Sequence, residues 1–190
     1  MRRLSLMFCA VLVFLLAVSS AAFSAEKAPA AIVEFAQNEL MRWGENPVIV
    51  KAVKDQNARG MTLEDIQALD ERWVKTPGIA DFMKPYLENE CAQELQKLQS
   101  SAPYFAEIFV TDNQGGLVAA TGKTSDYWQG DEAKFTECFR GEEGVLYISD
   151  VEFDESTQTY SVQISVPVRE EGKVIGVIVV GIDVDAFLGE

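Results

Sequence analysis

The chain has 190 residues, 16 basic and 30 acidic side chains, a formal net charge of −14 at pH 7 and no histidine. So acidic a surface argues against nucleic acid and anionic lipid as partners. The missing histidine removes the commonest general base, the Ser-His and Cys-His nucleophile pairs and most zinc sites. Composition therefore favours binding over catalysis, and we expect no enzymatic activity, no cofactor and no metal site.

The N-terminus has the composition of a secretory signal peptide. Arg2 and Arg3 form a short basic start, and an apolar run at 4–18 leads into a small-residue segment. We expect residues 1–24 to be cleaved and the protein to reside in a bacterial periplasm, with an uncleaved membrane anchor as the alternative. Cleavage would take the bases from 16 to 14 against 30 acids, a net charge of about −16.

Residues 25–103 have the periodicity of a helical region. From 28 to 58, apolar side chains recur at intervals of three and four, and Pro47 predicts a kink or break in that helix. The segment 62–65 resembles a capping box, with Asp in place of Glu, at the start of a second helix. A third helical stretch is expected over about 80–99, with Pro85 either in its first turns or at a restart.

Residues 104–190 change to the alternating period of strands. Turn signals at 112–116 and 170–173 predict two hairpins, and a short helix capped by Asp131 is expected between them at 132–139. The fold class is therefore α+β, with helices followed by an antiparallel sheet of about five strands. The expected strands cover residues 104–111, 117–121, 145–149, 160–166 and 174–182.

Two cysteines follow the signal segment, Cys91 and Cys138. In an oxidising compartment an even pair of cysteines is a candidate disulfide. Two buried thiols are the alternative, and the sequence leaves both open.

The run TSDYWQGDEAKF at 124–135 combines two large aromatics with carboxylates and an amide. Aromatic rings supply apolar contact area while polar groups fix orientation, which is the mixture that a small polar ligand needs from a pocket. The alternative is a capped helix start with both aromatics packed on a sheet. The acid excess favours a ligand with an amine or several hydroxyls over a dicarboxylate. The candidate ligand-binding residues are Asp126, Tyr127, Trp128, Gln129 and Asp131, with Tyr147, Asp150 and Asp183 from the sheet.

The order of these elements resembles that of Cache domains, also called PDC sensors, which are PAS-like extracellular ligand-binding modules. The resemblance covers about 104–185 and the preceding long helix. It rests on FVTD at 109–112 leading to Ala120, the Tyr127-Trp128 run, YIS at 147–149, SVPV at 165–168, and GKVIGV at 172–177 ending in Gly181-Ile182-Asp183.

After the signal peptide at 1–24, this resemblance divides the chain into a helical region at 25–103 and a PAS-like domain at 104–190. It also implies a periplasmic protein that captures a small polar metabolite and passes its state to a partner such as a membrane receptor. The apolar stripe of the first helix is a candidate homodimer surface. The alternatives are a structural or partner-binding protein without a ligand, and an enzyme that uses Asp126, Asp131 and Glu132.

Overall fold

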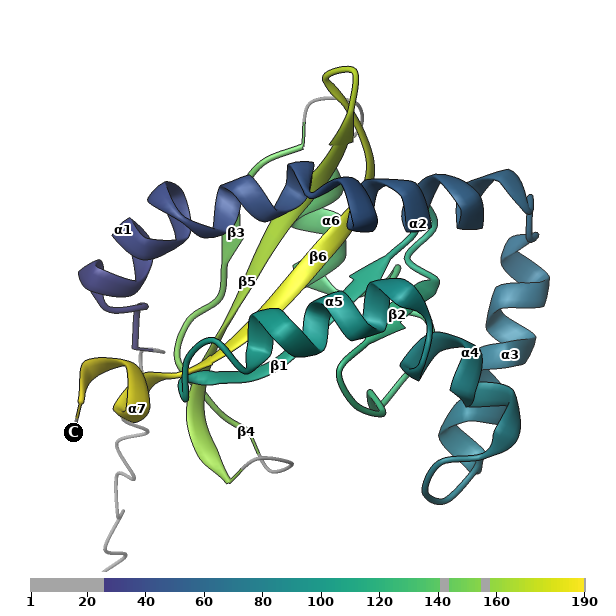
Figure 1. Cartoon of the computed structure of the whole chain (residues 1–190). Coiled ribbons are helices and arrows are strands. Elements are labelled where there is room, and N and C mark those ends of the chain that lie inside the picture. The colour runs from purple at the N-terminus through teal and green to yellow at the C-terminus, as the bar shows by residue number, and fades with distance from the viewer. Residues whose placement is uncertain (1–25, 141–143, 155–157, 190) are drawn as a thin grey trace, which may run out of the picture.

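A computed structural model describes residues 26–140, 144–154 and 158–189, so the predicted signal peptide lies outside the described residues. Its centre is a six-stranded antiparallel sheet in the order β2-β1-β6-β5-β3, with β4 pairing along β5 (Figure 1). Helices precede the sheet, which confirms the α+β class. Every helix in the described ranges is too short or too polar to span a bilayer.

The first helical stretch breaks where Pro47 predicts it. It consists of α1 (Ala30–Asn38), the 3-10 turn η1 (Leu40–Glu45) and α2 (Pro47–Ala58). The Asn46 side chain accepts a hydrogen bond from a backbone N–H in the first turn of α2, and Pro47 fits that turn because its missing N–H has no helical partner there.

The helix α3 (Leu63–Lys75) begins with the predicted capping box. The Thr62 hydroxyl accepts a hydrogen bond from the Asp65 N–H at 3.1 Å, and the Asp65 carboxylate accepts one from the Thr62 N–H at 3.3 Å. These two bonds satisfy backbone donors that a helix start leaves without partners. In Figure 1, α3 stands near α4 and β2, at the opposite end of the molecule from α1.

The helical stretch expected over 80–99 is present and is divided into three pieces, with Pro85 in the first turn of the second. They are η2 (Asp81–Met83), α4 (Lys84–Leu87) and α5 (Glu90–Gln99). Asn89 separates the last two, and its side chain accepts a hydrogen bond from a first-turn N–H of α5 while donating to the carbonyl oxygen of Val118. The restart therefore fixes α5 against β2.

The strands follow the predicted pattern, with one addition. The three-residue β4 was not predicted, because it is short and mostly exposed. β6 is central and buried on both faces, as its apolar sequence predicts. A short helix α7 (Val184–Leu188) follows it. The strands are β1 (Phe105–Thr111), β2 (Leu117–Ala120), β3 (Tyr147–Ile148), β4 (Glu152–Asp154), β5 (Thr159–Glu170) and β6 (Lys173–Asp183).

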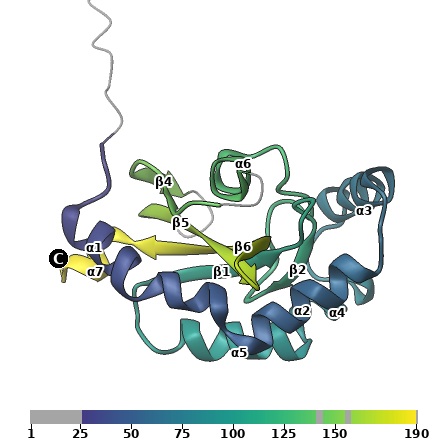
Figure 2. The same cartoon turned by 90° about the horizontal axis from the view of Figure 1, so that it is seen from above.

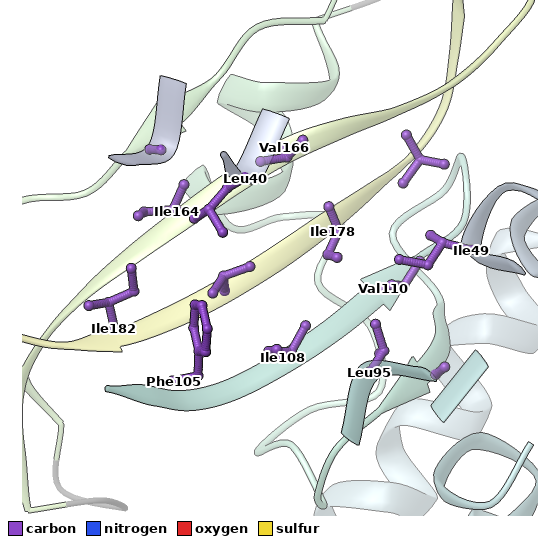
Figure 3. Close-up of a cluster of buried hydrophobic side chains, with 14 of the residues drawn as sticks. Leu40, Ile49, Leu95, Phe105, Ile108, Val110, Ile164, Val166, Ile178 and Ile182 are labelled. Carbon is purple, nitrogen blue, oxygen red and sulfur yellow. The ribbon is translucent and has the colours of Figure 1, made fainter. Parts of the chain in front are cut away.

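One face of the sheet packs against α1, η1, α2 and α5 (Figure 2). Figure 3 shows this core, in which Ile108 and Val110 of β1 meet aliphatic side chains of β5 and β6. Gly44 is needed where η1 crosses β5, because a Cβ there would collide with the carbonyl oxygen of Pro167. The helical region and the sheet therefore share one core.

The opposite face packs against α6 (Ala133–Phe139), the segment before it and residues of α3 and α4. Cys91 lies in the first core and Cys138 in the second, both buried and both free. The candidate disulfide is therefore wrong, since the sheet separates the two thiols.

Candidate functional site

The face of the sheet that carries α6 is divided into an apolar half and a polar half. In the apolar half, Phe109 lies beside Val179, and Val179 lies beside Ser165. In the polar half, the adjacent row consists of Glu107, Gly181 and Gln163. Phe135 and Cys138 of α6 pack over the apolar row, whereas the polar row faces a cavity.

This cavity has a volume of about 540 Å³, within the range of roughly 300–1,000 Å³ that is typical of small-molecule sites. Two other hollows are smaller, about 160 Å³ between α2 and α5 and about 200 Å³ along β1 and β2. Strands β1, β4 and β5 and the loops after β2 and β3 contribute to the large cavity. The lining residues are Glu107, Lys123, Thr124, Ser125, Ser149, Glu152, Phe153, Asp154, Ser161 and Gln163.

Glu107 is the carboxylate of the polar row, and its side chain is half-buried. Gly181 makes room for it, because a Cβ at Gly181 would lie 2.8 Å from the Glu107 Cγ. Gln163 Nε2 donates to Glu107 Oε1 at a long 3.4 Å. Burial raises the pKa of Glu107 above its ordinary value, and the nearby Lys134 ammonium opposes that shift. Among the described residues, the carboxylate therefore has one long hydrogen bond from Gln163 and the opposing charge of Lys134.

Lys134 of α6 places a positive charge near the boundary between the two halves. Its side chain is 11% exposed, its Nζ lies 2.9 Å from Glu132 Oε2, and it sits 5.6 Å from the ring centroid of Phe109. Ser165, beside the polar row, is fully buried, and its hydroxyl has no hydrogen-bond partner within the described ranges. Charged and polar groups thus extend to the edge of the apolar half.

Tyr127 belongs to a packed aromatic cluster instead of the cavity lining. It is fully buried, its ring lies 5.1 Å from that of Tyr86 and 5.8 Å from that of Trp73, and its hydroxyl accepts a hydrogen bond from Gln56 at 3.3 Å. Burial raises the pKa of its hydroxyl well above the ordinary value. This placement matches the alternative of aromatics packed on a sheet.

Trp128 and Gln129 are held by the chain around them. The N–H groups of Tyr127 and Trp128 both donate to one carboxylate oxygen of Asp70, at 2.8 and 3.0 Å. The Trp128 indole donates to the carbonyl oxygen of Gln114 at 2.8 Å. Gln129 is buried, and its Nε2 donates to the carbonyl oxygen of Asp126 at 2.9 Å. These contacts fix the segment as a structural unit.

The remaining candidates are dispersed. Asp131 is exposed, and Glu132 occupies the N-cap position of α6 that the sequence assigned to Asp131, so that assignment is wrong. Asp150 pairs with Lys27 at 2.7 Å, and the Asp183 side chain caps α7.

Tyr147 pairs with Ser165 in the ladder between β3 and β5 and packs against the second core. None of the eight candidates lines the 540 Å³ cavity, to which their run contributes only its first residues, Thr124 and Ser125. Their role in ligand binding stays a prediction.

Sequence reasoning missed Glu107, Gln163 and Ser161. Glu107 is the one acidic residue in a strand that is mostly apolar. A lone charge at a position expected to be buried is a signal that could have been used. Ser161 and Gln163 alternate with apolar residues along β5, a pattern that is typical of a half-buried strand with its polar side toward solvent. In the structure Ser161 is only 7% exposed, so this side of the strand is largely covered.

No protein-family model and no curated protein matches the chain. Among solved structures, it resembles the sensor domain of the histidine kinase DctB of V. cholerae, with 14% identity and a TM-score of 0.49 over 83% of this chain and 50% of that one. It also resembles the extracellular domain of vpHK1S-Z8, with 9% identity and a TM-score of 0.48 over 83% of this chain and 52% of that one.

A third similar structure is the sensory domain of the Campylobacter jejuni chemoreceptor Tlp3 with isoleucine bound. The identity is 16% and the TM-score 0.39, over 80% of this chain and 60% of that one. This chain thus spans between half and two thirds of the length of these solved chains. Two of these three solved chains are described as sensor or sensory domains and the third as an extracellular domain.

Proposed function

We propose that the chain is a periplasmic sensor or binding protein that captures a small polar metabolite and passes its state to a partner. The observation that carries the proposal is the cavity of about 540 Å³ over the polar row of the sheet. Polar side chains in the middle of a sheet face cost stability unless something pairs with them, and a bound metabolite would supply the missing partners.

The composition of the lining supports a polar ligand. Glu107 and Gln163 supply charged and amide groups from the sheet, and Ser149 and Ser161 supply hydroxyl groups. A few placed polar groups of this kind fix the orientation of a small molecule in its site.

A membrane receptor remains the proposed partner, whereas a homodimer through the first helical stripe has less in its favour. Ile32 and Leu40 of that stripe are fully buried in the chain's own core. Phe35 and Trp43 contact Phe105 at ring centroid distances of 6.2 and 5.3 Å. A dimer along this stripe would need surface that the sheet already covers.

The test is a melting-temperature screen against metabolites of different charge, because a ligand that binds only the native state raises stability by mass action. Ser161→Phe places an aromatic ring in the cavity and should abolish the shift given by any hit. Ser100→Phe, on an exposed residue at the end of α5, is the matched control and should leave the shift unchanged. Hits that bind Ser161→Phe and the wild type equally would contradict the proposal and favour the partner-binding alternative.

A further inference from the structure

We infer that helix α3 positions one wall of the cavity and carries the state of the cavity to the outside of the molecule. This cavity wall is the segment 123–125, which follows β2 and lines the cavity. The inference rests on the proposed function, because it names the element that transmits the state of the same cavity. It goes further in assigning that role to α3, although none of the described residues that line the cavity belongs to this helix.

Two hydrogen bonds join α3 directly to the cavity wall. The buried indole N–H of Trp73 donates to the carbonyl oxygen of Thr124 at 2.8 Å. At the end of the helix, the carbonyl oxygen of Thr76 accepts a hydrogen bond from the Lys123 ammonium at 2.7 Å. The first bond runs from the helix to the wall and the second from the wall to the helix, so the first two residues of the wall are both tied to α3.

Asp70 ties the chain that follows the wall to the same helix. One of its carboxylate oxygens accepts the N–H groups of Tyr127 and Trp128, at 2.8 and 3.0 Å. Hydrogen bonds to an ionised acceptor are stronger than those between neutral groups. Asp70, Trp73 and Thr76 recur at intervals of three, and residues at that interval lie on the same side of a helix. One side of α3 therefore contacts both ends of the segment 123–128.

The helix itself is weakly anchored in the protein. Of its thirteen residues, Ile66 and Trp73 are buried. Leu63 and Val74 are 43% and 54% exposed, and Figure 1 shows α3 at the end of the molecule away from α1. Elements with few buried apolar contacts open locally at a low free-energy cost. The stability of α3 therefore depends strongly on its bonds to the segment 123–128.

An occupant of the cavity should restrain α3 through these bonds. The occupant packs against the cavity wall and limits its movement. Local opening of α3 then has to break the bonds made by Asp70 and Trp73, because the wall no longer follows the helix. The free energy of opening α3 rises, and by linkage a partner that binds α3 in its closed form binds the occupied protein more tightly.

The experiment fills the cavity covalently, so that it does not depend on which metabolite binds. Ser161 lines the cavity and is 7% exposed, and Ser161→Cys replaces its hydroxyl by a thiol of similar size. Benzyl methanethiosulfonate converts this thiol into a benzyl mixed disulfide and releases methanesulfinate. Cys91 and Cys138 are buried, and mass spectrometry checks that a single label is attached. Amide hydrogen exchange of the full chain is then measured with and without the label.

We expect the label to slow amide exchange in α3 about threefold or more and to leave exchange in α1, on the other face of the sheet, unchanged. The same label on Ser100→Cys, outside the cavity, should leave α3 unchanged. Asp70→Ala should remove most of the effect in α3. Glu71→Ala is its matched control, because the Glu71 side chain is 73% exposed, and it should preserve the effect.

The inference is overturned if α3 exchanges equally with and without the label on Ser161→Cys, if α1 slows as much as α3, or if Asp70→Ala keeps the full effect. The labelled and unlabelled forms of Ser161→Cys decide the matter even if Asp70→Ala is too unstable to study. The proposed function fails separately, when no metabolite of any charge gives a melting shift that Ser161→Phe abolishes.

Discussion

The sheet face under α6 has two halves that differ in a few residues: one half is packed with apolar side chains, and the other faces a cavity. The apolar half buries Phe109 and Val179 beneath Phe135, and its neighbouring loop anchors Tyr127 in an aromatic cluster. The polar half, one ladder row away, carries Glu107 and leaves it facing a cavity. Under the proposed function, the polar half keeps a side chain that costs stability because it serves binding, whereas the packed half serves the fold.

The largest effect is expected from truncation in the apolar half. Tyr127→Ala should lower the free energy of unfolding by about 3–5 kcal/mol, because it leaves a cavity among Trp73, Tyr86 and Gln56. Tyr127→Phe, the control, should cost only about 1 kcal/mol, since it removes one hydrogen bond and no volume. Urea titration measures both. A Tyr127→Ala variant that stays stable but no longer binds a metabolite would instead make Tyr127 a ligand-binding residue.

A smaller stability effect with a larger binding effect is expected in the polar half. In Gly181→Ala the new methyl group displaces the Glu107 side chain, which is flexible, so the cost should be about 1–3 kcal/mol. Binding of the cavity ligand should fall by about tenfold or more, because the carboxylate moves. Gly122→Ala is the control, since a methyl group there would meet nothing within 4 Å. Equal binding by both variants would remove Glu107 from the site.

The pH dependence of stability separates the halves further. Burial raises the pKa of Glu107, so the native state holds its proton more tightly than the unfolded chain. Stability from this group is highest below the ordinary glutamate pKa of about 4.3 and falls as the pH rises through the raised value. Lys134 opposes the shift, and Asp154 and Glu132 add to it.

Glu107→Gln should therefore melt at a higher temperature than the wild type at about pH 7, and the difference should close towards about pH 4. Thermal melts at several pH values measure this. A variant that is less stable at neutral pH would mean that Glu107 is structural, with a partner worth more than its burial costs.

The smallest effect is expected from a reducing agent. Cys91 and Cys138 lie in the two separate cores, and burial raises the pKa of each thiol to about 12. Reductant should leave the melting temperature unchanged, and both thiols should resist alkylation until the protein unfolds. Mass spectrometry of the alkylated peptides measures this, and a Cys91–Cys138 cross-linked peptide would contradict the separation of the cores.

The sequence predicted the fold better than the site, for a physical reason. Periodicity and turn residues are local signals, so the break at Pro47, the capping box at Thr62 and the central β6 could be predicted. The division at Asn89 was missed because the apolar stripe continues through it. The weak pairing that forms β4 depends on β5 and leaves no local pattern.

The site depends on strand register, which a single sequence does not provide. Glu107, Gly181 and Gln163 lie far apart in the chain and become neighbours only through the ladders of β1, β6 and β5. The aromatic run around Tyr127 is the more visible feature of the sequence, but the Tyr127 ring packs on Trp73 and Tyr86. These contacts join residues far apart in the chain, which composition does not reveal. Its polar beginning, Thr124 and Ser125, does reach the cavity.

A crystal structure of the chain with a metabolite selected by the melting screen would show directly whether the polar half of the sheet binds a ligand. We expect the metabolite in the cavity between β1, β4 and β5, with a polar group of the metabolite within hydrogen-bond distance of Glu107 or Gln163. A metabolite seated instead between α2 and α5, or against Tyr127 and Trp128, would contradict the assignment of binding to the polar half.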